Sequence, residues 1–121
     1  AQLRTLDLSD NHLGRHGAQL LTSLPSMRSL ERLRLHHCGL APEGVEALCQ
    51  DHAFEQLTHL DLERNALRSE GLLTLLDSDI LRHVKTLNLG TNKIGDDAIE
   101  ALAESPHIES LERIILHWNP L

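Results

Sequence analysis

The chain repeats one pattern every 27 residues, without a single insertion or deletion, along all of its 121 residues. The pattern reads L-x-x-L-x-L-x-x-N-x-L, and it occurs five times. A fixed period of this length is typical of solenoids, in which each unit packs only on its two neighbours. We therefore expect the whole chain to fold as one array. The first apolar column contains Leu3, Leu30, Leu57, Val84 and Leu111, and the last contains Leu13, Leu40, Leu67, Ile94 and Leu121.

The second half of each unit has the spacing of a helix. Small residues precede apolar residues that lie three and four positions later, which is one helical turn. Acidic residues such as Glu43 and Glu70 lie beside the small residue, where the helix dipole favours negative charge. Each unit should therefore hold a short strand, spanning about residues 4–9 in the first unit, and a helix that the small residue allows to approach the sheet closely. The small-residue column contains Gly17, Gly44, Gly71 and Ala98.

The repeat resembles that of the leucine-rich repeat family, and the resemblance covers the whole chain. Units of this length that contain a helix are similar to the ribonuclease-inhibitor-like subclass, and residues 101–107 look like repeats of large bacterial proteins. The resemblance implies an α/β leucine-rich repeat solenoid, a right-handed β-α superhelix with a parallel inner sheet and outer helices. We expect a single domain over 1–121, divided into repeats 3–29, 30–56, 57–83 and 84–110 and a partial repeat 111–121, with no recognisable caps.

A polar column inside the pattern has a structural interpretation. An asparagine amide can both donate to and accept from backbone groups that are left unpaired where the chain turns away from the strand. We expect this column to satisfy those groups within the core. Its members are Asn11, Cys38, Asn65, Asn92 and Asn119.

Composition excludes several classes of function. The chain has 27 Leu but only one Phe, one Trp and no Tyr, so it lacks the successive aromatic side chains on which single-stranded nucleic acid stacks. Its net charge is −7, and no run rich in Lys or Arg offsets the repulsion of a phosphate backbone. We therefore expect no nucleic acid partner.

The number of cysteines and the length of the apolar runs indicate the cellular compartment of the protein. Cys38 and Cys49 are too few for the disulfide framework of a small secreted protein, and no apolar run reaches the roughly 18 residues of a membrane span. We expect a cytoplasmic, intracellular protein without membrane association. Because terminal repeats normally need a polar cap, the uncapped ends predict either a piece of a longer protein or self-association through those ends.

The strand positions that vary most between repeats are predicted to project onto the concave face of the array. Strands lie about 4.8 Å apart, so five repeats place five rows of side chains side by side. Trp118 and Ile115 are the expected anchors of a protein partner, because Trp and Arg are the commonest hot-spot residues. The predicted protein-binding residues are Arg32, Arg34, His36, His59, Asp61, Glu63, Arg64, Arg113, Ile115, His117 and Trp118.

Two structural alternatives apply to the same residues. Asp7, Arg34 and Asp61 occupy one column on consecutive strands. One alternative role of Arg34 is therefore to pair with the two carboxylates in a cross-strand charge ladder. Trp118 can instead pack against a following repeat. The ladder does not exclude a partner. A separate alternative is that the array acts as an architectural spacer or connector, and in that case we expect no partner for the concave face.

Two chemical alternatives also arise on this face. Zinc-type ligands are present at His36, His37, His59, Asp61 and Glu63, although without the tight spacing of common zinc motifs. Ser9, His36 and Glu63 share a column and have the composition of a catalytic triad. An open sheet face, however, offers neither a pocket nor oxyanion donors. We therefore predict a non-catalytic protein-interaction module with no cofactor, and keep the spacer, the self-associating solenoid and the metal-binding face as alternatives.

Overall fold

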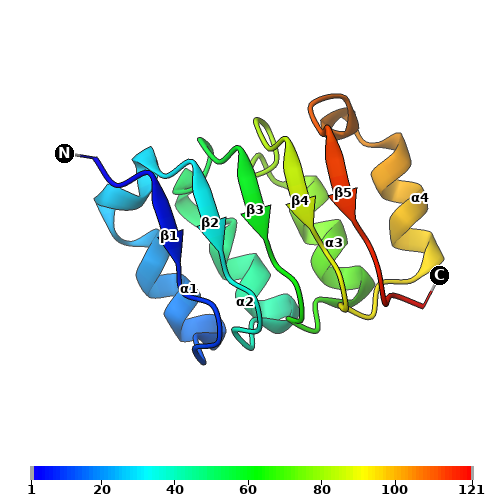
Figure 1. The fold of residues 1–121 in the computed structure, drawn as a ribbon, viewed down its shortest axis with the longest axis horizontal. Coiled ribbons are helices and arrows are strands. Elements are labelled where there is room, and N and C mark those ends of the chain that lie inside the picture. The colour runs from blue at the N-terminus through cyan, green and yellow to red at the C-terminus, as the bar shows by residue number, and fades with distance from the viewer. Residues whose placement is uncertain (1, 121) are drawn as a thin grey trace.

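The computed structural model describes residues 2–120, in which a layer of parallel strands lies in front of a layer of helices (Figure 1). The strands follow one another across the sheet in chain order, and each strand residue pairs with the residue 27 positions later. Thr5, for example, pairs with Arg32. The predicted α/β solenoid with a parallel inner sheet is confirmed. The strands are β1 (Thr5–Asp7), β2 (Arg32–Arg34), β3 (His59–Asp61), β4 (Thr86–Asn88) and β5 (Arg113–Ile115).

One helix returns the chain after each of the first four strands. Each helix contacts the next one along the chain, so the helices form a second layer parallel to the sheet (Figure 1). Packed helices lie about 8–10 Å apart, whereas strands lie about 4.8 Å apart. The array must therefore bend with the sheet on its inner side, and the sheet face that points away from the helices is the concave face. The helices are α1 (Gly14–Thr22), α2 (Ala41–Leu48), α3 (Arg68–Asp77) and α4 (Asp96–Glu104). Residues 2–120 also contain three 3₁₀ helices, η1 (Pro25–Ser29), η2 (Gln50–His52) and η3 (Pro106–Glu109).

Each strand is shorter than the sequence predicts, because the chain turns soon after it. In the first repeat the strand ends at Asp7, and Asp10 adopts a left-handed conformation with φ of 63°. The turn residue still donates its N–H to the next repeat, as His37 does to the Glu63 carbonyl at 2.9 Å. In each repeat, therefore, only the first two of the side chains predicted to face outward belong to the strand. The next two belong to the turn that follows it. The corresponding left-handed residues are His37, Arg64, Thr91 and Trp118.

The leucine columns form one continuous core between the two layers. Leu30, Leu57 and Val84 of the first column are fully buried, and Phe54 fills the space beneath the return to β3. At the first repeat the same column is open, and Leu3 is 42% exposed. Leu121, the last member of the predicted columns, lies outside the described residues.

The small-residue column has a different cause from the predicted one. A Cβ atom on Gly44 would lie 2.8 Å from Cβ of Leu40, four residues earlier on the same chain. Leu40 comes this close because Ala41, between them, is left-handed with φ of 57°. The glycine therefore accommodates the start of its own helix, and our expectation that it serves close approach of helix and sheet is wrong. The fourth repeat enters its helix through an extended residue instead and carries Ala98 in this column.

The polar column forms a hydrogen-bonded ladder, as predicted. Asn65 Oδ1 accepts the N–H groups of Cys38 at 2.9 Å and Leu40 at 3.3 Å. Its Nδ2 donates to the carbonyls of Leu35 at 2.7 Å and Leu62 at 3.0 Å. One amide thus satisfies backbone groups of its own repeat and of the preceding one, which locks neighbouring repeats together.

Candidate functional site

The second strand column carries the charge ladder that the sequence suggests. Arg34 on β2 lies between two carboxylates, with Nη1 3.3 Å from Asp7 Oδ2 and Nε 3.5 Å from Asp61 Oδ2. The Arg34 side chain is more than half exposed, so each pair contributes at most about 1 kcal/mol to stability. The ladder is confirmed, and it orients Arg34 while leaving part of the guanidinium open to solvent.

The same column also terminates the strands. In the first, third and fourth repeats, Oδ1 of Asp7, Asp61 and Asn88 accepts the backbone N–H of the residue two positions later, at 3.0 Å in each case. The hydroxyl of Ser9 and its backbone N–H hold the pKa of Asp7 below its usual value, helped by the positive charge of Arg34. These side chains therefore hold the turn that follows the strand.

A shallow groove of about 340 Å³ runs across the first two columns of the concave face. Leu33 and Leu60 border it through the strand backbone, because their side chains are buried in the core on the other face of the sheet, and Ile115 of β5 also lines it. Arg32 and Arg34 line it from β2. The groove thus joins apolar surface to exposed guanidinium groups. The remaining lining residues are Thr5, His59, Asp61, Thr86 and Asn88.

His59 lies in the middle of this groove. Its Nδ1 is 2.9 Å from the hydroxyl of Thr58. Burial lowers the pKa of His59, and the nearby cations Arg32 and Lys85 lower it further. At neutral pH the imidazole is therefore uncharged, and the positive charge of the groove comes from its arginines.

A second group of polar residues lies where the strands end, around Glu63. Its carboxylate accepts from Asn88 Nδ2 at 3.0 Å and lies 3.6 Å from both His36 Nδ1 and His117 Nε2. Arg64 Nε is 3.8 Å from it. Glu63 is only 18% exposed, so the half-buried carboxylate is surrounded by donors. We call these residues, His36, Glu63, Arg64, Asn88 and His117, the Glu63 cluster.

His117 reaches Glu63 from two strands away because the intervening repeat has a glycine. A Cβ atom on Gly90 would lie 2.6 Å from His117 Nε2. The absent side chain provides the space through which the His117 ring crosses the fourth repeat. In the sequence this glycine lies in the same column as Glu63 and His117. The sequence does not show which side chain occupies the space that the glycine leaves.

The triad-like column does not have the geometry of a triad. Ser9 Oγ accepts the backbone N–H of His36 at 3.1 Å, whereas the His36 imidazole faces Glu63. The serine hydroxyl thus binds the backbone of the next repeat. Among residues 2–120 the column joins repeats rather than pairing a nucleophile with a base.

The two predicted anchors lie in different places. Ile115 lines the groove, but Trp118 lies at the left-handed turn after β5, is 83% exposed and does not line the groove. Arg113 is exposed on β5 and also lies outside the groove lining. The predicted site therefore divides into the groove, the Glu63 cluster, and the isolated Arg113 and Trp118.

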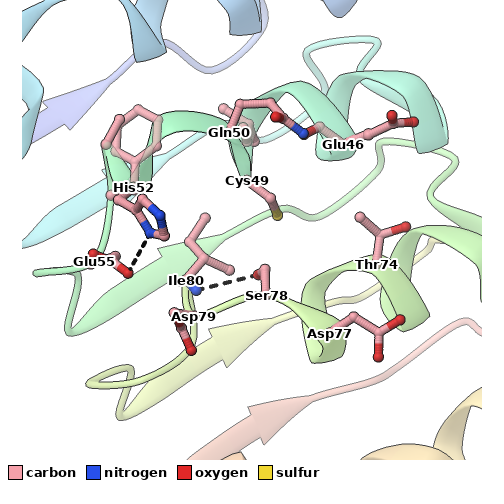
Figure 2. A pocket seen from close by; sticks show the side chains of 13 residues that line it. Glu46, Cys49, Gln50, His52, Glu55, Thr74, Asp77, Ser78, Asp79 and Ile80 are labelled. Atoms are coloured by element: carbon pink, nitrogen blue, oxygen red, sulfur yellow. Dashed lines mark hydrogen bonds and ion pairs between the residues drawn. The ribbon is translucent and has the colours of Figure 1, made fainter.

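Histidines and carboxylates of the concave face do not converge as metal ligands. In the described part of the chain, the group that brings three such ligand atoms within 4.8 Å of one another is His52, Glu55 and Asp79. It lies beside a separate pocket between the C-terminal ends of α2 and α3 (Figure 2). In the sequence, only the 27-residue step between His52 and Asp79 signals their proximity.

Both cysteines are free. Burial raises the pKa of the Cys38 and Cys49 thiols. Cys38 replaces asparagine in the polar ladder, and its Sγ donates to the Leu8 carbonyl at 3.2 Å.

Comparison with known proteins agrees with the geometry. The model of a family described as Leucine Rich repeat matches four segments, residues 2–21, 26–49, 56–76 and 81–103. The chain belongs to the leucine-rich repeat family. Repeat arrays of this type use their extended concave surfaces to bind other proteins.

A curated relative matches part of the array. A Ran GTPase-activating protein of Drosophila melanogaster is 49% identical over 51 residues, which is 40% of this leucine-rich repeat chain and 9% of that protein. The match thus spans less than a tenth of the relative's length. None of the helices in residues 2–120 is both long and apolar enough to cross a membrane.

Proposed function

We propose that this leucine-rich repeat array is a non-catalytic, intracellular module that binds another protein through its concave face. The observation that carries the proposal is the groove, which combines the apolar side chain of Ile115 with two exposed arginines on a five-stranded frame. Arg32 and Arg113 form no ion pair with carboxylates of the described residues. They are therefore available to an acidic group on a partner.

The chemistry of the groove favours a protruding segment with one apolar side chain next to a carboxylate. The apolar side chain would lie over the strand backbone against Ile115, and the carboxylate would meet Arg32 and Arg34. Arginine binds a carboxylate through two parallel hydrogen bonds, which gives direction as well as energy. The Glu63 cluster is already internally paired, so it contributes to the rim of the interface rather than to its centre.

The test compares the protein with matched variants in quantitative co-purification, followed by affinity measurement with each purified partner. We expect the double variant Arg32→Glu and Arg34→Glu to lose at least one partner, with a loss of about tenfold or more in affinity. Arg15→Glu on α1 and Arg28→Glu in the 3₁₀ helix that follows it carry the same charge change on the outer side, so this double variant serves as control. If every partner binds both variants equally, the array is a spacer or connector, which is the alternative function.

Self-association is distinguished by a separate measurement. Sedimentation velocity over a range of concentrations reports whether the array forms dimers or longer assemblies. A species that remains monomeric at high concentration excludes the self-associating solenoid and leaves the proposal for the concave face intact.

The Drosophila relative is named as a Ran GTPase-activating protein. The absence of catalysis can therefore be tested by measuring GTP hydrolysis by Ran in the presence of this chain. We expect this chain not to accelerate GTP hydrolysis by Ran, because the match covers only a small part of that GTPase-activating protein. Hydrolysis that accelerates in proportion to the added chain would show that the module activates a GTPase rather than only binding proteins.

A further inference from the structure

The pocket between the ends of α2 and α3 is outside the proposed protein-binding face. It has a volume of about 370 Å³. Figure 2 shows His52 and Glu55 pointing toward each other on the segment that follows α2, with Asp79 on the neighbouring segment that follows α3. His52 Nδ1 lies 2.9 Å from Glu55 Oε1. One imidazole and two carboxylates of successive repeats therefore meet at one edge of the pocket.

Donor atoms of the three side chains are close enough for a single ion. One imidazole nitrogen and one oxygen from each carboxylate all lie within 4.8 Å of one another. Ligand atoms that surround a tetrahedral zinc ion at about 2.0–2.2 Å lie about 3.5 Å apart, so the side chains must approach one another by at most roughly an ångström to bind the ion. His52 and Asp79 are both exposed, and their side chains have that freedom.

Charges around the pocket point to a cation as its ligand. Carboxylates line it at Glu46, Glu55, Asp77 and Asp79, whereas its lining includes no Lys or Arg. The negative potential of four carboxylates with no fixed cation among them attracts a positive ion. This observation is independent of the distances between the three ligand side chains.

The repeat register gives a third observation. His52 and Asp79 occupy the same position in consecutive repeats, and that position holds Pro25 and Pro106 in the first and fourth repeats. In those two repeats the proline begins a 3₁₀ helix. The second and third repeats thus replace this proline with two side chains that can bind a metal ion, and parallel stacking places them side by side.

We propose that His52, Glu55 and Asp79 bind a divalent transition-metal ion of the zinc type and that the ion links the second and third repeats. A nitrogen ligand with two carboxylates suits zinc, whereas calcium and magnesium prefer oxygen ligands alone. Three protein ligands leave a fourth tetrahedral position for water. Because the unfolded chain does not hold the three side chains together, the ion stabilises the folded state.

The experiment measures thermal unfolding and metal affinity on the whole chain, reduced and freed of metal, with zinc chloride as the probe. We expect zinc to raise Tm by about 5 °C or more when its concentration is about 100 times the dissociation constant. Calcium and magnesium chloride at the same concentration should shift Tm by much less. Cobalt chloride should give the visible absorption of a coordinated ion.

Variants assign the effect to the three residues. His52→Asn suits the left-handed backbone at position 52, where φ is 53°, and Asp79→Asn preserves side-chain shape. Each should weaken zinc binding about tenfold or more and remove most of the Tm shift, with little change in the Tm of the metal-free protein. His83→Asn, an exposed loop histidine outside the group, should retain the full response.

Three outcomes overturn the proposal. The first is an equal zinc response in His52→Asn, Asp79→Asn and His83→Asn, which would mean that scattered histidines bind the ion. The second is an equal response to calcium that His52→Asn does not alter, which would indicate a general cation effect of the acidic pocket. The third is loss of the response only in Cys49→Ser, which would assign the ion to the thiol that also lines the pocket.

Discussion

Gly90 and His117 fit together, because the His117 ring occupies the space where a side chain on Gly90 would be. A Cβ atom on Gly90 would lie 2.6 Å from His117 Nε2 and 2.9 Å from its Cδ2. The vacant space lets the ring cross the fourth repeat and approach Glu63, 3.6 Å away on the third. The Glu63 cluster thus connects the second repeat to the fifth through one missing side chain.

We expect Gly90→Ala to separate His117 from Glu63 with little loss of stability. The His117 side chain is half exposed and can move away, so the free energy of unfolding should fall by less than about 1 kcal/mol. NMR should show a change in the ring proton shifts of His117 and nearly unchanged shifts for His36, which approaches Glu63 from the other side. Unchanged His117 shifts would mean that the ring does not lie over Gly90 in solution.

Asn65→Ala should be among the most destabilising single substitutions in the chain. It leaves buried N–H groups of Cys38 and Leu40 and buried carbonyls of Leu35 and Leu62 without this partner. We expect a loss of about 3–5 kcal/mol in urea-induced unfolding.

Asn11→Ala provides the matched control for Asn65→Ala, because it occupies the same column in the first repeat. The Asn11 amide is exposed and donates only to the carbonyls of Leu8 and Ser9. We expect a loss of less than about 1 kcal/mol. Equal losses at the two positions would show that the ladder does not derive its strength from burial.

Gly44→Ala tests the reason for the small-residue column through the sign of its effect. Helix propensity alone predicts that alanine stabilises this helix by about 1 kcal/mol relative to glycine. The added Cβ would instead lie 2.8 Å from Cβ of Leu40, so we expect a net destabilisation of about 1–3 kcal/mol. Chemical denaturation measures it. A stabilised variant would mean that Leu40 has room to move.

Protonation of His59 should oppose folding. Burial and nearby cations lower its pKa in the folded state, so the unfolded chain binds the proton more readily. Above the unfolded-state pKa of about 6.5, His59 is uncharged in both the folded and the unfolded chain, and its protonation does not change the free energy of unfolding. Its contribution to stability becomes unfavourable as pH falls from there through the folded pKa. An NMR titration should place the His59 midpoint below that of a model histidine.

Removal of Arg32 should raise the pKa of His59. Arg32→Ala eliminates a neighbouring positive charge that disfavours the imidazolium, so the midpoint of the His59 titration should move upward. Arg15→Ala on α1 makes the same change on the other side of the array and should leave the midpoint where it is. A midpoint that does not respond to Arg32→Ala would place the arginine farther from the imidazole than in the structure.

The 27-residue period was sufficient to predict the architecture. Because every leucine column keeps one step, parallel stacking is the arrangement that buries Leu30, Leu57 and Val84 on one another. The period also predicted the asparagine ladder and the salt bridges of Arg34, since residues 27 positions apart become neighbours on adjacent strands. Such properties follow from sequence because they depend only on register.

Tertiary structure decided everything that depends on the path of a side chain or a turn. The left-handed residue after each strand moved Trp118 out of the groove, and the same conformation at Ala41 explains Gly44 better than sheet contact does. The reach of His117 across Gly90, and the meeting of His52 with Glu55 and Asp79, depend on rotamers and loop shape. The repeat determined which residues are neighbours, whereas local backbone geometry determined which of those neighbours touch.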